Sequence, residues 1–350
     1  NTQTTTGKTT WSNTLNYIYS SENHNLNALA GIEYYHENGD TFWASRQEFV
    51  NEDEDFTYLD SGTGAKDNGG SAVENVLLSY FGKVSYSYKD KYLASATLRY
   101  DGSSRFGQNN RYGFFPAFSA GWRLSEEAFI KDNISFLNDL KFRFGWGITG
   151  NQEIDNNAIY NIYVTNYANT SYDISGDKSG VLPSGYVLTQ NANPDLRWET
   201  TTAFDIALEA SLFGGRLFTE FNYYQKETND LLLDVTIPRQ TGYTNQLQNI
   251  GSLENKGWEF LLTSTNVSKP NFNWNSTLTL SSNKNKILDL GGEEFIDVVV
   301  DQILGAGNLR LIVGQPSPVF TGAQYLGTWK SQEEIDASGQ DPATNAVGGP

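Results

Sequence analysis

One segment near the middle of the chain alternates apolar and polar side chains, and this alternation constrains the fold more than any other feature. From Leu140 to Ile148 the sequence reads Leu-Lys-Phe-Arg-Phe-Gly-Trp-Gly-Ile. Successive side chains of a β-strand point to opposite faces of the sheet, so one face here is aromatic and the other is charged or glycine. The same period of two recurs over 76–88 and 202–212. The pattern predicts an antiparallel sheet with one apolar and one polar face.

Composition narrows the class of protein. The 350 residues are 38% hydrophobic and 14% aromatic, which suits one large domain. No apolar run reaches the length of about 18 residues that a membrane-spanning helix needs, whereas a membrane barrel needs apolar residues only at alternate positions. The net charge of −17 argues against nucleic-acid binding, and the absence of cysteine excludes disulfides and thiolate sites.

The lengths of the predicted connections indicate a sheet with two different ends. Short connections alternate with long ones, so consecutive hairpins would place all short turns at one end and all long loops at the other, as the two sides of an outer membrane require. Aromatic residues also gather near the short turns, as in the girdle at a membrane interface. A short helical turn is expected after Ser125. The predicted strands are 11–20, 26–35, 76–88, 92–100, 112–124, 140–148, 197–212, 217–225, 257–267 and 272–281, with long loops over 37–70, 151–195 and 238–248.

Five ordered segments, 98–107, 111–123, 144–152, 193–200 and 249–259, carry a family resemblance. Together they resemble the SusC/RagA-like branch of TonB-dependent outer-membrane transporters. The motif residues that we carry over as structural are Arg99, Asp101, Gly102, Arg105, Phe106, Gly107, Pro116, Trp122, Gly147, Gly150, Asn151, Pro194, Trp198, Glu199, Gly251, Gly257 and Glu259.

The resemblance implies an all-β fold, an antiparallel transmembrane β-barrel. Residues 1–350 would supply about ten of its roughly 22 strands, without the plug domain and without a signal peptide. We therefore expect a fragment or an incomplete gene product, located in the outer membrane. The implied function is import of oligosaccharides (glycans) or peptides, with no cofactor. The implied partners are a SusD-like surface lipoprotein, the TonB complex acting through the missing plug, and outer-membrane lipid.

Some motif residues also have a direct physical interpretation. Asp101 and Gly102 form a turn-competent pair, and Arg99 and Arg105 flank Asp101 closely enough for a local ion pair. Gly147 lies on the face opposite the aromatic side chains, where it permits close approach of the backbone. Trp198 and Trp258 are expected to anchor the wall of the sheet.

Ligand contacts are expected from aromatic and amide side chains in the long loops, because sugars and peptides bind by ring stacking and hydrogen bonding. Packing of each loop on its neighbours is the competing role of every one of these residues. The candidates are Phe42, Trp43, Tyr58, Tyr160, Tyr163, Tyr167, Tyr172, Asn166 and Asn169.

No segment has the pattern of a catalytic or metal site. His24 and His36 lie in no metal-binding motif, and the chain has no nucleophile elbow or phosphate-binding loop. The run from Asn51 to Asp55 makes a calcium site conceivable, but it lacks the glycine and terminal glutamate of an EF-hand and fits a solvated loop better.

Two other classes of protein remain open at this stage. A secreted or surface-displayed β-sandwich or propeller that binds glycans or mediates adhesion would bury the rings of Phe142 and Phe144, which a barrel exposes. An outer-membrane barrel enzyme would need a tight cluster of titratable groups inside the barrel, with lumen carboxylates such as Asp205, Glu209 and Glu220.

Overall fold

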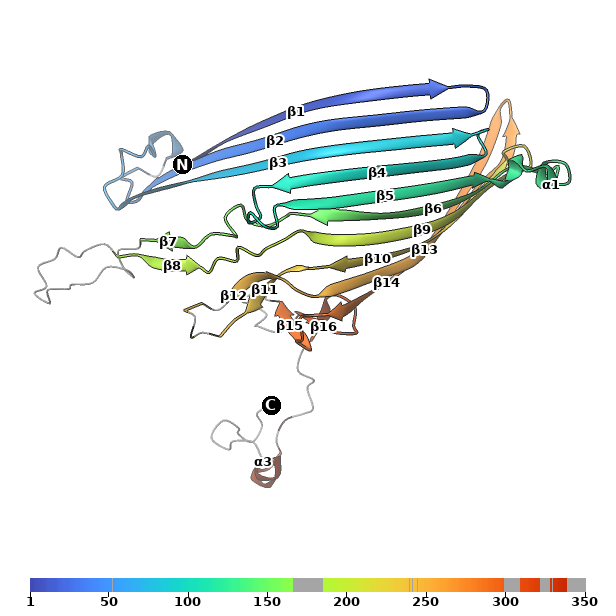
Figure 1. Cartoon of the computed structure of the whole chain (residues 1–350). Coiled ribbons are helices and arrows are strands. Elements are labelled where there is room, and N and C mark those ends of the chain that lie inside the picture. Colours follow the sequence, from blue (N-terminus) through green and yellow to red (C-terminus); the bar gives the residue numbers. More distant parts are fainter. Residues whose placement is uncertain are drawn as a thin grey trace, which may run out of the picture.

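Ten long strands form one antiparallel sheet in which each strand pairs with the next along the chain (Figure 1). The computed structural model describes residues 1–51, 53–165, 185–238, 240, 242–243, 245–298, 309–321, 328 and 330–338. The strands of this sheet are, in order, β1 (Thr2–Ser20), β2 (His24–Arg46), β3 (Lys66–Tyr88), β4 (Tyr92–Ser103), β5 (Tyr112–Arg123), β6 (Leu137–Asn151), β9 (Glu199–Leu212), β10 (Leu217–Asn229), β13 (Ser252–Lys269) and β14 (Phe272–Asp289).

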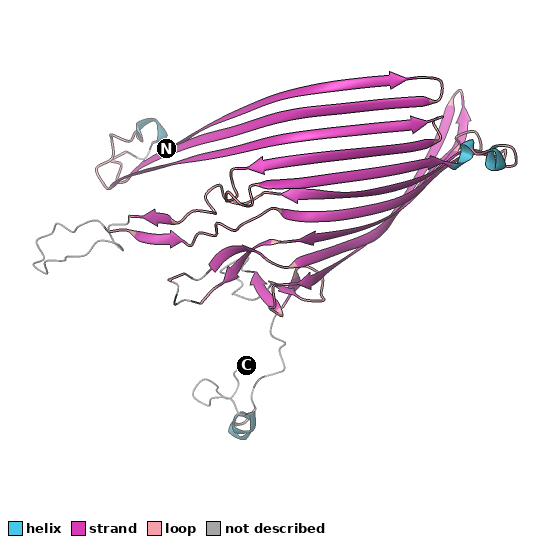
Figure 2. Cartoon of the chain, viewed as in Figure 1, coloured by secondary structure: helices cyan, strands magenta, loops and turns pink. Residues whose placement is uncertain are grey.

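Shorter strands and helical turns lie in the connections at the two ends of this sheet (Figure 2). Two hairpins and one small three-stranded sheet lie among the long connections, and the helical turns are short. These elements are β7 (Ile162–Val164), β8 (Val187–Gln190), β11 (Leu232–Thr236), β12 (Asn245–Asn249), β15 (Phe295–Val298), β16 (Leu309–Ile312), β17 (Val319–Phe320), η1 (Glu54–Phe56), η2 (Leu124–Glu126), α1 (Ala128–Lys131) and α3 (Gln332–Ser338).

The strand register sorts the side chains onto two faces. Phe142 pairs with Leu208 and Phe144 with Ile206, so these residues lie together on one face, which we call the apolar face. Lys141 pairs with Glu209 on the opposite face, the polar face. The prediction of one apolar and one polar face is therefore confirmed.

The apolar face is not packed against another layer. Phe142 and Phe144 are each 38% exposed, and among the described residues no second sheet covers them. A sandwich buries such rings between two sheets about 10 Å apart. The arrangement is that of a barrel wall, and the sandwich interpretation is wrong.

Short turns and long loops lie at opposite ends of the sheet, as predicted (Figure 1). At the short-turn end, β3 and β4 are joined through Lys89 and Asp90, whose φ angles of 53° and 50° are those of a tight hairpin turn. The other end, the long-loop end, holds the connections β2–β3, β4–β5, β6–β9 and β10–β13.

Strands β2 and β3 extend well past the boundaries predicted for them. The prediction placed a loop over 37–70, but β2 continues to Arg46 and β3 begins at Lys66. The paired ends are rich in polar residues and glycine, and exposed residues occur on both of their faces. Backbone pairing does not depend on side-chain polarity, so a ribbon that meets water on both sides carries no hydrophobic period to read.

The other predicted long loops also contain structure. The loop over 151–195 includes the β7–β8 hairpin, and the loop over 238–248 includes part of β12. Both hairpins are too short for alternation to reveal them. The helical turn after Ser125 is present as η2 and α1.

Candidate functional site

The polar face of the wall carries a ladder of ion pairs across three strands. Lys141 on β6 lies 3.3 Å from Glu209 on β9, and Arg143 pairs with the same carboxylate. Arg143 also donates a 2.6 Å hydrogen bond to Glu220 on β10. These side chains are partly exposed, so each pair is worth about 1 kcal/mol or less. The ladder neutralises charge along the wall, and each carboxylate is bound to a cation rather than clustered with other acids.

A second polar group lies on the same face of β3 and β4. Arg99 donates to Asp101 at 2.7 Å and to Ser79 at 2.9 Å. Glu33 on β2 lies 3.8 Å from the same guanidinium. The predicted ion pair of Asp101 therefore forms with Arg99, and Arg105 is used elsewhere.

A small hydrophobic core lies at the long-loop end. We call it the loop core: the buried residues are Phe106, Phe115, Ala158, Ile159, Leu196 and Trp198. The Trp198 ring lies 5.2 Å from both the Phe106 ring and the Phe115 ring, and Trp198 Nε1 donates to the carbonyl of Arg111 at 3.1 Å. Burial of each large side chain contributes about 2 kcal/mol. Leu232 and Leu247 pack against it, so the loop core joins the β4–β5, β6–β9 and β10–β13 connections.

Trp198 differs from its predicted place in the wall. Strand β9 begins at Glu199, two residues later than predicted, so Trp198 precedes the strand and is buried in the loop core. Trp258, by contrast, lies on the apolar face opposite Tyr223. The alternation of Trp198 with Glu199 resembles a strand pattern and could not reveal this difference.

Two motif glycines allow the loops to approach closely. A Cβ on Gly107 would overlap the carbonyl of Pro194. A Cβ on Gly150 would overlap the Phe115 ring and lie 2.9 Å from the Trp198 ring. At these two positions a Cβ would collide with its neighbours, so only glycine fits without a local shift.

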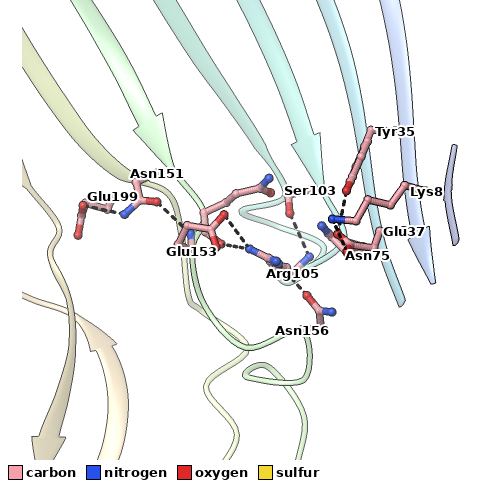
Figure 3. Close-up of polar contacts among 12 residues, drawn as sticks. Lys8, Tyr35, Glu37, Asn75, Ser103, Arg105, Asn151, Glu153, Asn156 and Glu199 are labelled. Carbon is pink, nitrogen blue, oxygen red and sulfur yellow. Dashed lines mark hydrogen bonds and ion pairs between the residues drawn. The ribbon is translucent and has the colours of Figure 1, made fainter. Parts of the chain in front are cut away.

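Arg105 joins the β4–β5 turn to the loop that follows β6 (Figure 3). Its guanidinium donates to Asn156 Oδ1 at 2.7 Å and to the carbonyl of Gln152 at 2.9 Å, and it lies 3.3 Å from Glu153. The Arg105 side chain is only 14% exposed. On the other side of the turn, Ser104 Oγ accepts a 2.9 Å hydrogen bond from the backbone N–H of Val76 on β3. The turn thus connects strand β3 to the β6–β7 loop through hydrogen bonds on both sides.

Amide and carboxylate side chains fix the next connections along the sheet. Asn151 donates to Glu199 at 3.0 Å, and Glu199 in turn accepts from the backbone N–H of Leu232 at 3.2 Å. Asn249 bonds both backbone groups of Arg197. A hydrogen bond to Asp230 raises the pKa of Arg197. The base of the β11–β12 hairpin is therefore held to the start of β9.

The other motif residues lie in or beside the strands of the sheet, in contact with neighbouring strands or turns. Trp122 donates to Glu127 at 3.0 Å, and Glu259 lies on the polar face beside Asn222. Gly251 has φ of +82°, and a Cβ on Gly257 would overlap the carbonyl of Ser282. Pro116 lies opposite Leu98, and Gly102 lies opposite Tyr112.

At the short-turn end, one carboxylate joins several aromatic residues. Tyr92 donates to Glu127 at 2.8 Å, and Lys91 donates to the second carboxylate oxygen at 3.1 Å. The rings of Tyr88, Tyr92 and Trp122 stack in sequence with centroids 6.4 Å apart. Hydrogen bonds from Tyr92, Trp122 and Lys91 hold the pKa of Glu127 below its usual value. This cluster agrees with an aromatic girdle at the rim.

The structure does not gather the five predicted ligand residues that it describes into one site. Phe42 and Trp43 lie on opposite faces of the β2 extension, and Tyr58 lies beyond it in the β2–β3 loop. Tyr163 lies on β7, and Tyr160 lies just before β7 in the loop that follows β6. Tyr167, Tyr172, Asn166 and Asn169 lie outside the described residues. Their role in ligand binding stays a prediction.

The acidic run in the β2–β3 loop is organised by local turns. Asn51 Oδ1 accepts from the backbone N–H of Asp53, and Asp53 Oδ1 accepts from that of Asp55 at the start of η1. Within the described part of the chain no group of three or more histidine, cysteine, aspartate or glutamate residues is arranged to hold a metal ion. No helix in that part has the length and apolar character needed to cross a membrane.

Comparison with known proteins assigns the class. Residues 1–343 match the family model described as TonB dependent receptor-like, beta-barrel. The chain therefore belongs to the TonB-dependent receptor β-barrel family, whose members are receptors and transporters of the outer membrane and not enzymes. The predicted family, fold class and location are confirmed.

Particular relatives narrow the comparison further. The chain is 50% identical to TonB-dependent receptor P26 of Formosa agariphila, over 97% of its own length and 34% of that protein. It is 40% identical to TonB-dependent receptor SusC of Bacteroides thetaiotaomicron, over 66% of its length and 22% of that protein. The chain spans about a third or less of these curated relatives.

Among solved structures, the RagAB peptide transporter superimposes with a TM-score of 0.81 and 28% identity. The match covers 94% of this chain and 35% of that one. The fold of this chain therefore resembles about a third of that structure.

Proposed function

We propose that this chain forms part of an importer that carries oligosaccharides, or alternatively peptides, across the outer membrane. Its polar face would line the lumen and its apolar face would meet lipid. The observation that supports this proposal is a ten-stranded wall with ion-paired charges on one face and exposed rings on the other. Similarity to SusC favours a transporter of the same branch, and the RagAB title names a peptide transporter.

The proposal includes two partners. A SusD-like lipoprotein would close over the long-loop end, where the hairpins and the β2–β3 ribbon project beyond the wall. The TonB complex would supply energy through a plug domain of the longer protein. No step of covalent chemistry is required of this chain.

The proposal is tested in cells that carry the full-length gene. Deletion of the gene is expected to abolish growth on one glycan or peptide source while growth on monosaccharides and amino acids continues. Loss of TonB should give the same defect, and an affinity-tagged receptor should copurify with a surface lipoprotein. Normal growth of the deletion strain on every polymeric source would contradict the proposal.

A further inference from the structure

A cleft of about 410 Å³ opens between the β7–β8 and β11–β12 hairpins at the long-loop end. A cleft of this size accommodates a small ligand or a segment of a larger one. The described residues of its lining include Asp155 and Asp234, both carboxylates, and no lysine, arginine or histidine. None of the residues that line it was among the predicted ligand contacts.

The walls of the cleft are held in place by hydrogen bonds to the backbone. Gln190 on one wall donates to the carbonyls of Asn157 and Tyr160 at 2.8 and 3.1 Å. Gln246 on the other wall donates to the carbonyl of Ala192 at 2.9 Å. Ala158 belongs to the loop core, and Leu247 packs against it. The cleft is therefore preorganised, which lowers the entropic cost of binding.

Polar groups remain available to a ligand. Asp155 accepts from the backbone N–H of Asn157 through Oδ1, and Asp234 accepts from Asn245 through Oδ2. Within the described part of the chain, each of these carboxylates has its second oxygen unused, and no hydrogen bond engages the Asn191 amide. The cleft thus offers both acceptors and donors.

The charge and donor pattern define the ligand class. Two carboxylates repel sulfate and carboxylate groups, and no cation lies among the described residues of the lining. A sugar hydroxyl both donates and accepts, which matches carboxylates beside amides, and the Tyr243 ring adds a surface for stacking. A peptide would favour apolar side-chain pockets, and Ala158 and Leu247 are the only aliphatic residues among the described ones of this lining.

We propose that this cleft is a subsite for an uncharged, hydroxyl-rich oligosaccharide segment and that Asp155 and Asp234 exclude sulfated or carboxylated glycans. This inference rests on the proposed importer function and deepens it.

The test uses the purified full-length transporter and calorimetric titration. The probes are short oligomers of α-glucan, β-glucan, mannan and xylan, with sulfated carrageenan oligomers and short peptides as competing classes. At least one neutral oligomer should bind. Asp155→Asn and Asp234→Asn should each weaken it about tenfold, because a neutral amide replaces a charged acceptor without changing shape. Asp60→Asn, an exposed carboxylate in the β2–β3 loop, is the matched control and should bind normally.

Two further variants sharpen the result. Asn191→Trp should block the cleft and abolish binding of the neutral oligomer, and Asp234→Lys should raise the affinity for the sulfated oligomer. The inference is overturned if no neutral oligomer binds, if the sulfated oligomer or the peptides bind the unaltered protein more tightly, or if the cleft variants bind like the control. Import of a sulfated glycan or a peptide in the growth assay would leave the importer proposal standing while this inference fails.

Discussion

Nε of Arg105 donates a 2.7 Å hydrogen bond to Oδ1 of Asn156, which lies 51 residues further along the chain. This contact and the bond to the Gln152 carbonyl fasten the β6–β7 loop to the β4–β5 turn. The guanidinium is largely shielded from water, so its hydrogen bonds compete little with solvent.

Replacement of this arginine should loosen the loop without unfolding the wall. Arg105→Met removes three polar contacts, and we expect a local destabilisation of about 1–3 kcal/mol. Hydrogen exchange of residues 152–162 should become faster while exchange within β4 and β6 is unchanged. Arg111→Met, at an exposed arginine of the same connection, is the control and should leave both rates unchanged. Equal protection in the two variants would show that Arg105 does not hold the loop.

The ion-pair ladder is expected to behave as a coupled unit. Glu209→Gln leaves Lys141 and Arg143 without their shared carboxylate, at a cost of about 1 kcal/mol in the free energy of unfolding. Adding Lys141→Gln should recover part of this loss, because the unpaired cation is then removed. A double-mutant cycle from urea-induced unfolding in lipid vesicles measures the coupling. Strict additivity of the two changes would rule out an interaction on the polar face.

The apolar face should not tolerate a charge. Phe144→Arg, near the middle of β6, is expected to reduce the free energy of membrane folding by about 2–4 kcal/mol, as for an arginine near the centre of a bilayer. Ser281→Arg, on the polar face of β14 opposite Glu259, should cost far less. Folding of the full-length protein into vesicles, followed by heat-modifiable migration on gels, compares the two. If the two variants fold equally well, lipid does not contact the apolar face.

Glu127 and its hydrogen-bond donors at the short-turn end, Tyr92, Trp122 and Lys91, predict a specific dependence of stability on pH. The pKa of Glu127 is lowered in the folded protein, so its contribution to stability is present above the unfolded value of about 4.3 and is lost as pH falls through the lower folded pKa. The thermal stability of the unaltered protein should therefore fall more steeply with decreasing pH in this acidic window than that of Glu127→Gln. Identical pH profiles for the two proteins would exclude a role of the carboxylate. Glu126→Gln serves as the neighbouring control.

The amino-acid sequence by itself determined the wall of this protein. Alternation is a local property, so it revealed the strands, their two faces and the ends of the short hairpins such as Tyr88 to Tyr92. Ordered motifs revealed the family. Where both faces of a strand meet water, as in the outer part of β2, the alternation disappears. The predicted strand therefore ended at residue 35, whereas β2 continues to Arg46.

Only the tertiary structure decided which distant groups meet. Arg143 reaches Glu220 two strands away because the register of β6, β9 and β10 aligns them, and Arg105 pairs with Glu153 instead of nearby Asp101 because the loop core brings the β6–β7 loop beneath it. The cleft between the two loop hairpins arises in the same way. Its residues are far apart in the chain, and each is an ordinary loop residue until packing places them side by side.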